Sequence, residues 1–134
     1  MSLYFRFPAF LFVFLLSACA SQLSSVDRQA NHAAHQLAAS HFDPSSRMLV
    51  TDTAKSIRPC LQQAYQHGVD DRQKGITRPQ AEANMQERLK NPDFGQIRAF
   101  FVGKIYESDR PEQSRKIMLD AMVASYWDGY EGRP

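Results

Sequence analysis

The 134-residue chain is the size of one domain, and its composition of 43% hydrophobic and 22% charged residues is typical of a globular protein. Its net charge is only +2, acids and bases are interleaved, and no block of Lys or Arg is present. These features argue against a nucleic-acid-binding surface, so we predict no nucleic-acid partner.

The N-terminal segment predicts a signal peptide. Residues 7–16, FPAFLFVFLL, form an apolar run of ten. A membrane-spanning helix needs ~20 such residues, whereas a run of this length is typical of the hydrophobic part of a signal peptide. LSAC follows, in which a large aliphatic residue and two small ones precede Cys19. This arrangement resembles the lipobox of bacterial lipoproteins. An ordinary secretory signal with a chance cysteine is the alternative.

The lipobox resemblance implies a specific processing of the chain. Cleavage falls between Ala18 and Cys19, a diacylglyceryl group is carried on the Cys19 sulfur, and the new amine is acylated. Several acyl chains anchor a protein stably to a membrane, and we expect no other cofactor. The next residue is Ala20 and not the Asp that retains such proteins in the inner membrane. The expected location is therefore the outer membrane, facing the periplasm.

The remaining chain divides into a short tether and one helical domain. With residues 1–18 as signal peptide, residues 19–25 are the lipidated tether and residues 26–134 the domain. Ser25 is the expected N-cap of the first helix, whose apolar stripe is mostly Ala. Residues 48–55 are expected as a short extended piece.

A second helix is expected from near Ser56 to Gly75, because Pro59 is tolerated in a first turn but not further inside a helix. TRPQ, NPDF and DRPE each place a Pro within a helix-start pattern. They predict helices over 78–90, 92–106 and 110–131, and hence an all-α fold, a small bundle of four to five helices. The expected buried stripes are Val26, Ala30, Ala33, Ala34, Leu37 and Ala38; Ile57, Leu61, Ala64, Tyr65, Gly68 and Val69; Ala81, Met85 and Leu89; Phe94, Ile97, Phe101 and Ile105; and Ile117, Met118, Ala121, Met122, Ser125, Tyr126 and Gly129.

Two segments echo each other, AYQHGVDD (64–71) and SYWDGYEG (125–132). In both, a Tyr precedes a Gly by three residues, which places the pair on one helix face. Gly68 and Gly129 would allow another helix to approach closely. An internal duplication is the alternative interpretation, and we favour the packing interpretation.

No residue cluster predicts a catalytic or metal site. His32 and His35 share a helix face, but His41 lies beyond the expected helix end, so we interpret them as surface residues and predict no metal site. Cys60 and His67 are about 10 Å apart along one helix, which disfavours a catalytic pair. No known catalytic fingerprint is present, and we predict that the protein is not an enzyme.

Two further features leave alternatives open. Once Cys19 carries lipid, Cys60 has no internal partner, so it is either a core thiol or the link of a disulfide-bonded homodimer. The C-terminal segment groups Tyr126, Trp127 and Tyr130. Exposed aromatic residues of this kind anchor protein interfaces, which makes these three the candidate partner-contact residues. A Trp that closes the end of the bundle is the alternative.

Four stretches give the chain the overall character of a known family: FRFPAFLFVFLLSAC, CLQQAYQHGVDDRQ, RLKNPDFGQIRAFF and MLDAMVASYWDGYEGRP. The chain resembles the entry-exclusion lipoproteins of small mobilisable enterobacterial plasmids. The resemblance implies an envelope protein that hinders uptake of related plasmids by contacting an envelope or conjugation protein. It supplies no residue role beyond Cys19. An outer-membrane structural or assembly lipoprotein, or an immunity-type lipoprotein that binds a periplasmic partner, is the alternative.

Overall fold

Four helices make up most of the part of the chain that the structure describes. The computed structural model describes residues 23–40, 50–91, 99–101, 104–106 and 110–134. The helices are α1 (Ser25–Ser40), α2 (Val50–Gln73), α3 (Arg78–Leu89) and α4 (Pro111–Glu131), and a small antiparallel hairpin joins β1 (Ala99–Phe101) to β2 (Lys104–Tyr106). The predicted fold class, a small all-α bundle, is confirmed.

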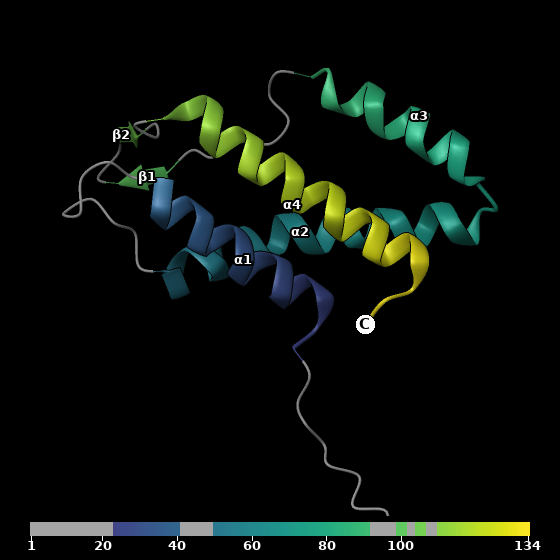
Figure 1. Cartoon of the computed structure of the whole chain (residues 1–134), viewed down its shortest axis with the longest axis horizontal. Coiled ribbons are helices and arrows are strands. Elements are labelled where there is room, and N and C mark those ends of the chain that lie inside the picture. The colour runs from purple at the N-terminus through teal and green to yellow at the C-terminus, as the bar shows by residue number, and fades with distance from the viewer. Residues whose placement is uncertain (1–22, 41–49, 92–98, 102–103, 107–109) are drawn as a thin grey trace, which may run out of the picture.

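Helices α1, α2 and α4 pack around one apolar core (Figure 1). α2 and α4 run in the same direction, and α1 runs opposite to them, so that α1 begins beside the end of α4. The core is rich in small side chains, which lets the three helices lie close together. Its buried members are Val26, Ala30, Ala33, Ala34, Leu37, Ala54, Ile57, Leu61, Ala64, Met118, Ala121 and Met122.

Helix α3 packs separately, against the C-terminal half of α4. Ala81 and Met85 are its only fully buried side chains, and they contact Tyr126 and Tyr130 of α4. The expected start of α3 is confirmed: the Thr77 N–H donates to Gln80 Oε1 at 3.0 Å, in a capping box. None of the helices within the described residues is both long and apolar enough to cross a membrane.

The beginnings of α1 and α2 differ from the sequence-based expectation. Ser24, and not Ser25, caps α1, because its Oγ accepts from the Asp27 N–H at 3.2 Å. α2 begins at Val50, so the extended piece expected over 48–55 is wrong from residue 50 onward. Its first turns are helical because Thr53 and Ala54 face the core.

The expectation that Pro59 lies in the first turn of its helix is therefore wrong. It lies inside α2, where it removes the hydrogen bond to the Lys55 carbonyl. Both residues are exposed, so water can hydrate that carbonyl. The end of α2 is as expected: Gly75 has φ +73°, and the Ile76 N–H donates to the Asp71 carbonyl at 3.0 Å.

The helix expected over 92–106 is wrong where the structure describes it. Ala99–Phe101 and Lys104–Tyr106 pair as strands, with Phe101 opposite Lys104. Aromatic and β-branched residues favour strands. Residues 92–98, with Phe94 and Ile97, lie outside the described residues. α4 has Arg110 as its N-cap residue, and Asp109 of the DRPE pattern also lies outside them.

Candidate functional site

The crossing of α2 and α4 brings the two echo segments into contact with each other. A Cβ atom on Gly68 would lie 2.0 Å from the Tyr126 carbonyl oxygen, and one on Gly129 would lie 2.0 Å from the Tyr65 carbonyl oxygen. Each glycine thus faces the backbone of the tyrosine in the other segment. The prediction that these glycines allow close helix approach is confirmed, and the contact is reciprocal.

The two tyrosine hydroxyls repeat this reciprocity. Tyr126 on α4 donates to Asp71 Oδ2, near the end of α2, at 2.7 Å. Tyr65 on α2 donates to the main-chain oxygen of Arg133, just beyond α4, at 3.0 Å. Each hydroxyl therefore donates to a residue at or just beyond the C-terminal end of the other helix. Burial and the bond to Asp71 raise the pKa of Tyr126, which remains a neutral donor at all ordinary pH values.

The candidate partner-contact residues lie largely inside the molecule. Tyr126 is 2% exposed and Tyr130 is 4% exposed, and Tyr130 donates to the Ile76 carbonyl at 2.6 Å. This is a correction: neither tyrosine is exposed to a partner in this fold, because α3 packs against both and α2 also packs against Tyr126. Trp127 is partly buried against the same cluster, and the Arg78 guanidinium lies 4.9 Å from its ring centroid. This agrees with Trp127 closing the bundle.

Cys60 lines a pocket of about 150 Å³ between α2, α3 and α4. His67 and Arg88 line the same pocket. Arg88 comes from α3, so its position beside Cys60 could not be predicted from the spacing along α2. The thiol is free and partly buried. Desolvation raises its pKa, so it is held as a thiol and not as the nucleophilic thiolate. The arrangement does not favour nucleophilic chemistry at Cys60.

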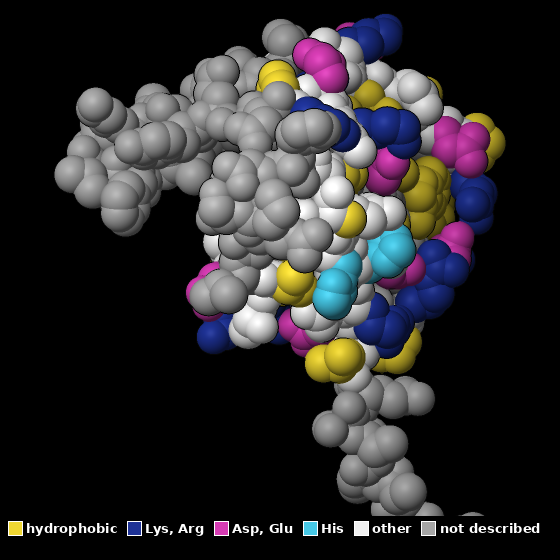
Figure 2. Space-filling model, turned by 60° about the vertical axis from the view of Figure 1, so that its left-hand side comes forward, with side chains coloured by type: hydrophobic (Ala, Val, Ile, Leu, Met, Phe, Trp, Pro, Cys, Tyr) yellow, Lys and Arg dark blue, Asp and Glu magenta, His cyan; other side chains and the backbone are white. Residues whose placement is uncertain are grey.

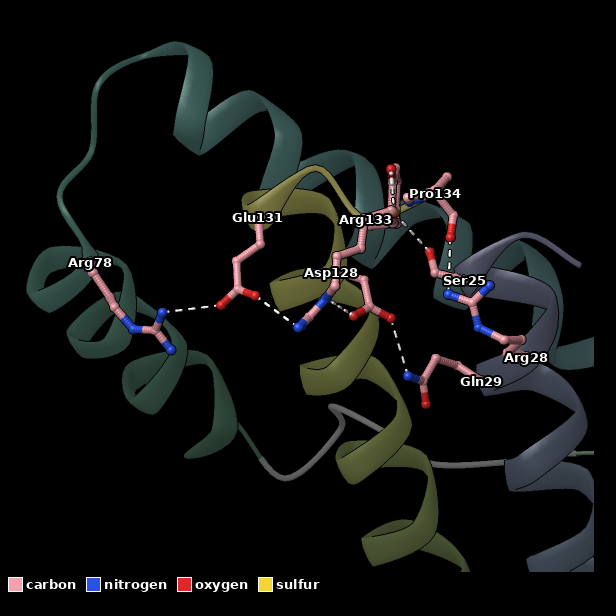
Figure 3. Close-up of polar contacts among 9 residues, drawn as sticks. Ser25, Arg28, Gln29, Arg78, Asp128, Glu131, Arg133 and Pro134 are labelled. Carbon is pink, nitrogen blue, oxygen red and sulfur yellow. Dashed lines mark hydrogen bonds and ion pairs between the residues drawn. The ribbon is translucent and has the colours of Figure 1, made fainter. Parts of the chain in front are cut away.

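The strongest convergence of polar groups is where α1 begins and α4 ends (Figure 3). Ser25 is 1% exposed and its Oγ donates to the Arg133 main-chain oxygen at 3.2 Å. Asp128 is buried and accepts from Gln29 Nε2 at 3.1 Å and from Arg133 Nε at 2.8 Å. Gly132, with φ +70°, turns the chain so that Arg133 reaches these partners. We name this region, residues 23–29 with 128–134, the α1–α4 end.

The charges of the α1–α4 end are paired unequally. Arg133 pairs with Asp128 and Glu131, and Glu131 also accepts from Arg78 at 3.0 Å. Arg28 instead donates to main-chain oxygens, those of Leu23 at 2.7 Å and Pro134 at 3.0 Å. Among the described side chains no carboxylate pairs with Arg28.

An ion pair joins this end to α2. Asp27 accepts from Arg58 Nε and from the Ser24 hydroxyl, the latter at 2.7 Å. The bond from Arg58, followed by those from Ser24, holds the pKa of Asp27 below its ordinary value. Burial acts in the opposite direction. Nearby, a pocket of about 300 Å³ opens at the surface, lined by Leu23, Ser24, Ser25, Val26, Gln62, Tyr65 and Pro134.

Several sequence-predicted site residues lie elsewhere or outside the description. Ala18, Cys19 and His41 fall outside the described residues. His32 and His35 are exposed on α1, and Figure 2 shows histidine side chains on a surface where acidic and basic side chains interleave. Within the described residues, no group of three or more His, Cys, Asp or Glu side chains is placed to hold a metal ion.

Comparison with known proteins gives no relative from which a function can be transferred. No protein-family model, curated protein or solved structure matches this chain.

Proposed function

We propose that this chain is a lipid-anchored protein of the bacterial envelope that hinders uptake of related plasmids through protein contacts. The observation that carries the proposal is LSAC directly behind a ten-residue apolar run. Cys19 would bear the diacylglyceryl and N-acyl chains and become the first residue of the mature protein. Ala20 favours the outer membrane, with the domain in the periplasm. The partner is a protein of the envelope or of the conjugation apparatus.

The fold supports a role based on contact. The helical domain starts at Ser25, only six residues after Cys19, and Ser25 is buried and bonded to the residue that follows Gly132. A tether this short would hold the domain close to the membrane. A compact domain held there would be well placed to obstruct a partner in the same layer of the envelope.

The decisive experiment compares plasmid uptake by conjugation. Recipient cells would express the wild-type chain or Cys19→Ala from a vector, with Cys60→Ala as the matched cysteine control that keeps the lipobox. We expect wild type and Cys60→Ala to lower the number of transconjugants and Cys19→Ala to lose the effect. Unchanged uptake with the wild-type chain would refute plasmid exclusion.

Labelling with a clickable fatty acid tests the anchor independently of exclusion. Wild type and Cys60→Ala should incorporate the label, and Cys19→Ala should not. Density-gradient fractionation of the same cells should place the labelled protein with the outer membrane. Label found in the inner membrane would contradict the assigned location while leaving the anchor in place.

A further inference from the structure

The proposed lipid anchor restricts which part of the bundle can face the membrane. The chain between Cys19 and Leu23 spans at most ~14 Å when fully extended, at ~3.5 Å per residue. α4 has 21 residues and is therefore ~31 Å long at ~1.5 Å per residue. Because Ser25 is bonded to Arg133, Leu23 cannot move away from the α1–α4 end without breaking that contact. The tether thus reaches this end of the bundle and falls far short of the other.

The side chains at this end have the chemistry of a lipid contact. Leu23 is 56% exposed and is the one large hydrophobic side chain exposed among the described residues. Arg28 lies one turn further along α1 and is exposed. Its contacts to Leu23 and Pro134 use two of its five N–H donors. The others remain available, and a guanidinium binds phosphate oxygens with matched geometry.

We propose that the α1–α4 end rests on the phospholipid headgroup layer, with Leu23 inserted among the lipids and Arg28 bound to a lipid phosphate. The inference rests on the proposed lipid anchor. The apolar side chain and the guanidinium lie side by side, since Arg28 donates to the Leu23 carbonyl oxygen. That combination suits the boundary between acyl chains and anionic headgroups, where apolar burial and charge attraction act together.

The experiment measures depth with a fluorophore on the lipidated full-length protein. The protein would be reconstituted in vesicles of phosphatidylethanolamine and phosphatidylglycerol that contain a lipid with a nitroxide headgroup, which quenches nearby fluorophores. In a Cys60→Ser background, the fluorophore is attached to Gln62→Cys, beside Leu23, or to Gln36→Cys as the control. Both positions are exposed, and position 36 lies ~16 Å along α1 from Ser25.

We expect several-fold stronger quenching at position 62 than at position 36. Equal quenching, or stronger quenching at position 36, would overturn the proposed orientation. Mass spectrometry of the same sample reads the lipid on Cys19. A chain without lipid overturns the anchor and this inference together, whereas a lipidated chain with reversed quenching overturns this inference alone. Exclusion in conjugation is a separate readout, so its failure with preferential quenching at position 62 would overturn only the exclusion role.

A charge substitution tests the part assigned to Arg28. Quenching at position 62 should rise with the fraction of phosphatidylglycerol for the parent protein, and this rise should be lost in Arg28→Gln. Lys55→Gln is the matched control, because it removes the same charge from an exposed residue in the first turns of α2. A rise that persists in Arg28→Gln would overturn the phosphate contact. Circular dichroism of each variant verifies that the bundle is folded.

Discussion

Adding a single methyl group at the α2–α4 crossing should separate the two helices. In Gly68→Ala the new Cβ would lie 2.0 Å from the Tyr126 carbonyl oxygen and 2.7 Å from the Tyr130 nitrogen. Both atoms belong to the backbone of a helix, so no side-chain rotation relieves the clash. The helices must move apart by about 1 Å or more, and such a gap forfeits about a quarter to a half of the dispersion attraction between the facing atoms.

The expected change in the free energy of unfolding is the sum of opposing effects. Overpacking costs typically ~1–3 kcal/mol, and loss of the Tyr126–Asp71 hydrogen bond adds to it. Ala in a helix gains ~1 kcal/mol over Gly. We expect Gly68→Ala and Gly129→Ala each to lower the free energy of unfolding by about 2–4 kcal/mol. The double variant should lose less than the two single losses together, because the first separation makes room for the second methyl group.

Urea unfolding followed by circular dichroism at 222 nm measures these effects. Gly75→Ala is the control, because nothing lies within 4 Å of its Cβ position and only its φ of +73° opposes the change. We expect that control to lose about 1 kcal/mol. If Gly68→Ala were more stable than wild type, helix propensity would dominate and the tight crossing would be refuted. Fully additive losses would contradict the shared-gap explanation.

Three further predictions concern hydrogen bonds and ionisation, each measured by urea unfolding. Ser125→Ala should raise the free energy of unfolding by about 1 kcal/mol, because the fully buried Ser125 Oγ has no hydrogen-bond partner among the described residues. The control Ser40→Ala should lower it, because that change removes a buried hydrogen bond. Tyr126→Phe should lose ~1.5–3 kcal/mol at pH 7. Because the pKa of Tyr126 is raised in the folded chain, its stabilising contribution is lost as pH rises above the ordinary tyrosine pKa near 10. The free energies of unfolding of wild type and Tyr126→Phe should therefore converge at high pH. Asp27→Asn should be less stable than wild type at pH 7. The difference should shrink as pH falls below about 4, the ordinary Asp pKa, and vanish once pH is below the lowered pKa in the folded chain, where Asp27 is protonated in both states. An unchanged difference at low pH would contradict that assignment.

Helical periodicity in the sequence predicts most of the core. Leu61, Met85 and Met118 are buried as their spacing predicts. Periodicity works for α1 and α2 because each buries one continuous stripe. It is less informative for α4, whose C-terminal half is buried on several sides by the other helices. It failed at the start of α2, because Pro59 disfavours a helix locally. Burial of the side chains in the preceding turns outweighs that cost in free energy. It also failed at the hairpin, where strand pairing depends on a partner that spacing alone does not reveal.

The candidate site was harder to predict because its contacts are tertiary. The echo of Gly68 and Gly129 was visible in the sequence, but their reciprocal contact depends on the parallel direction of α2 and α4. The burial of Tyr126 and Tyr130 was missed for the same reason, since it depends on how α2 and α3 pack against α4. Tyrosine suits both a protein interface and a buried position where its hydroxyl finds a hydrogen-bond partner. The tertiary contacts with α2 and α3 distinguish the two.

One main-chain oxygen connects the crossing to the proposed membrane-facing end. The Arg133 carbonyl accepts from Tyr65 of α2 and from Ser25 of α1, so three helices meet at the residue just beyond Gly132. Tyr65 is also the residue whose backbone packs against Gly129. The contact that sets the spacing of α2 and α4 therefore also fixes the first turn of α1. With the proposed anchor six residues before Ser25, the crossing would set how the whole domain stands on the membrane. The surfaces left for a partner protein would then be the sides of the bundle and the end at which α4 begins.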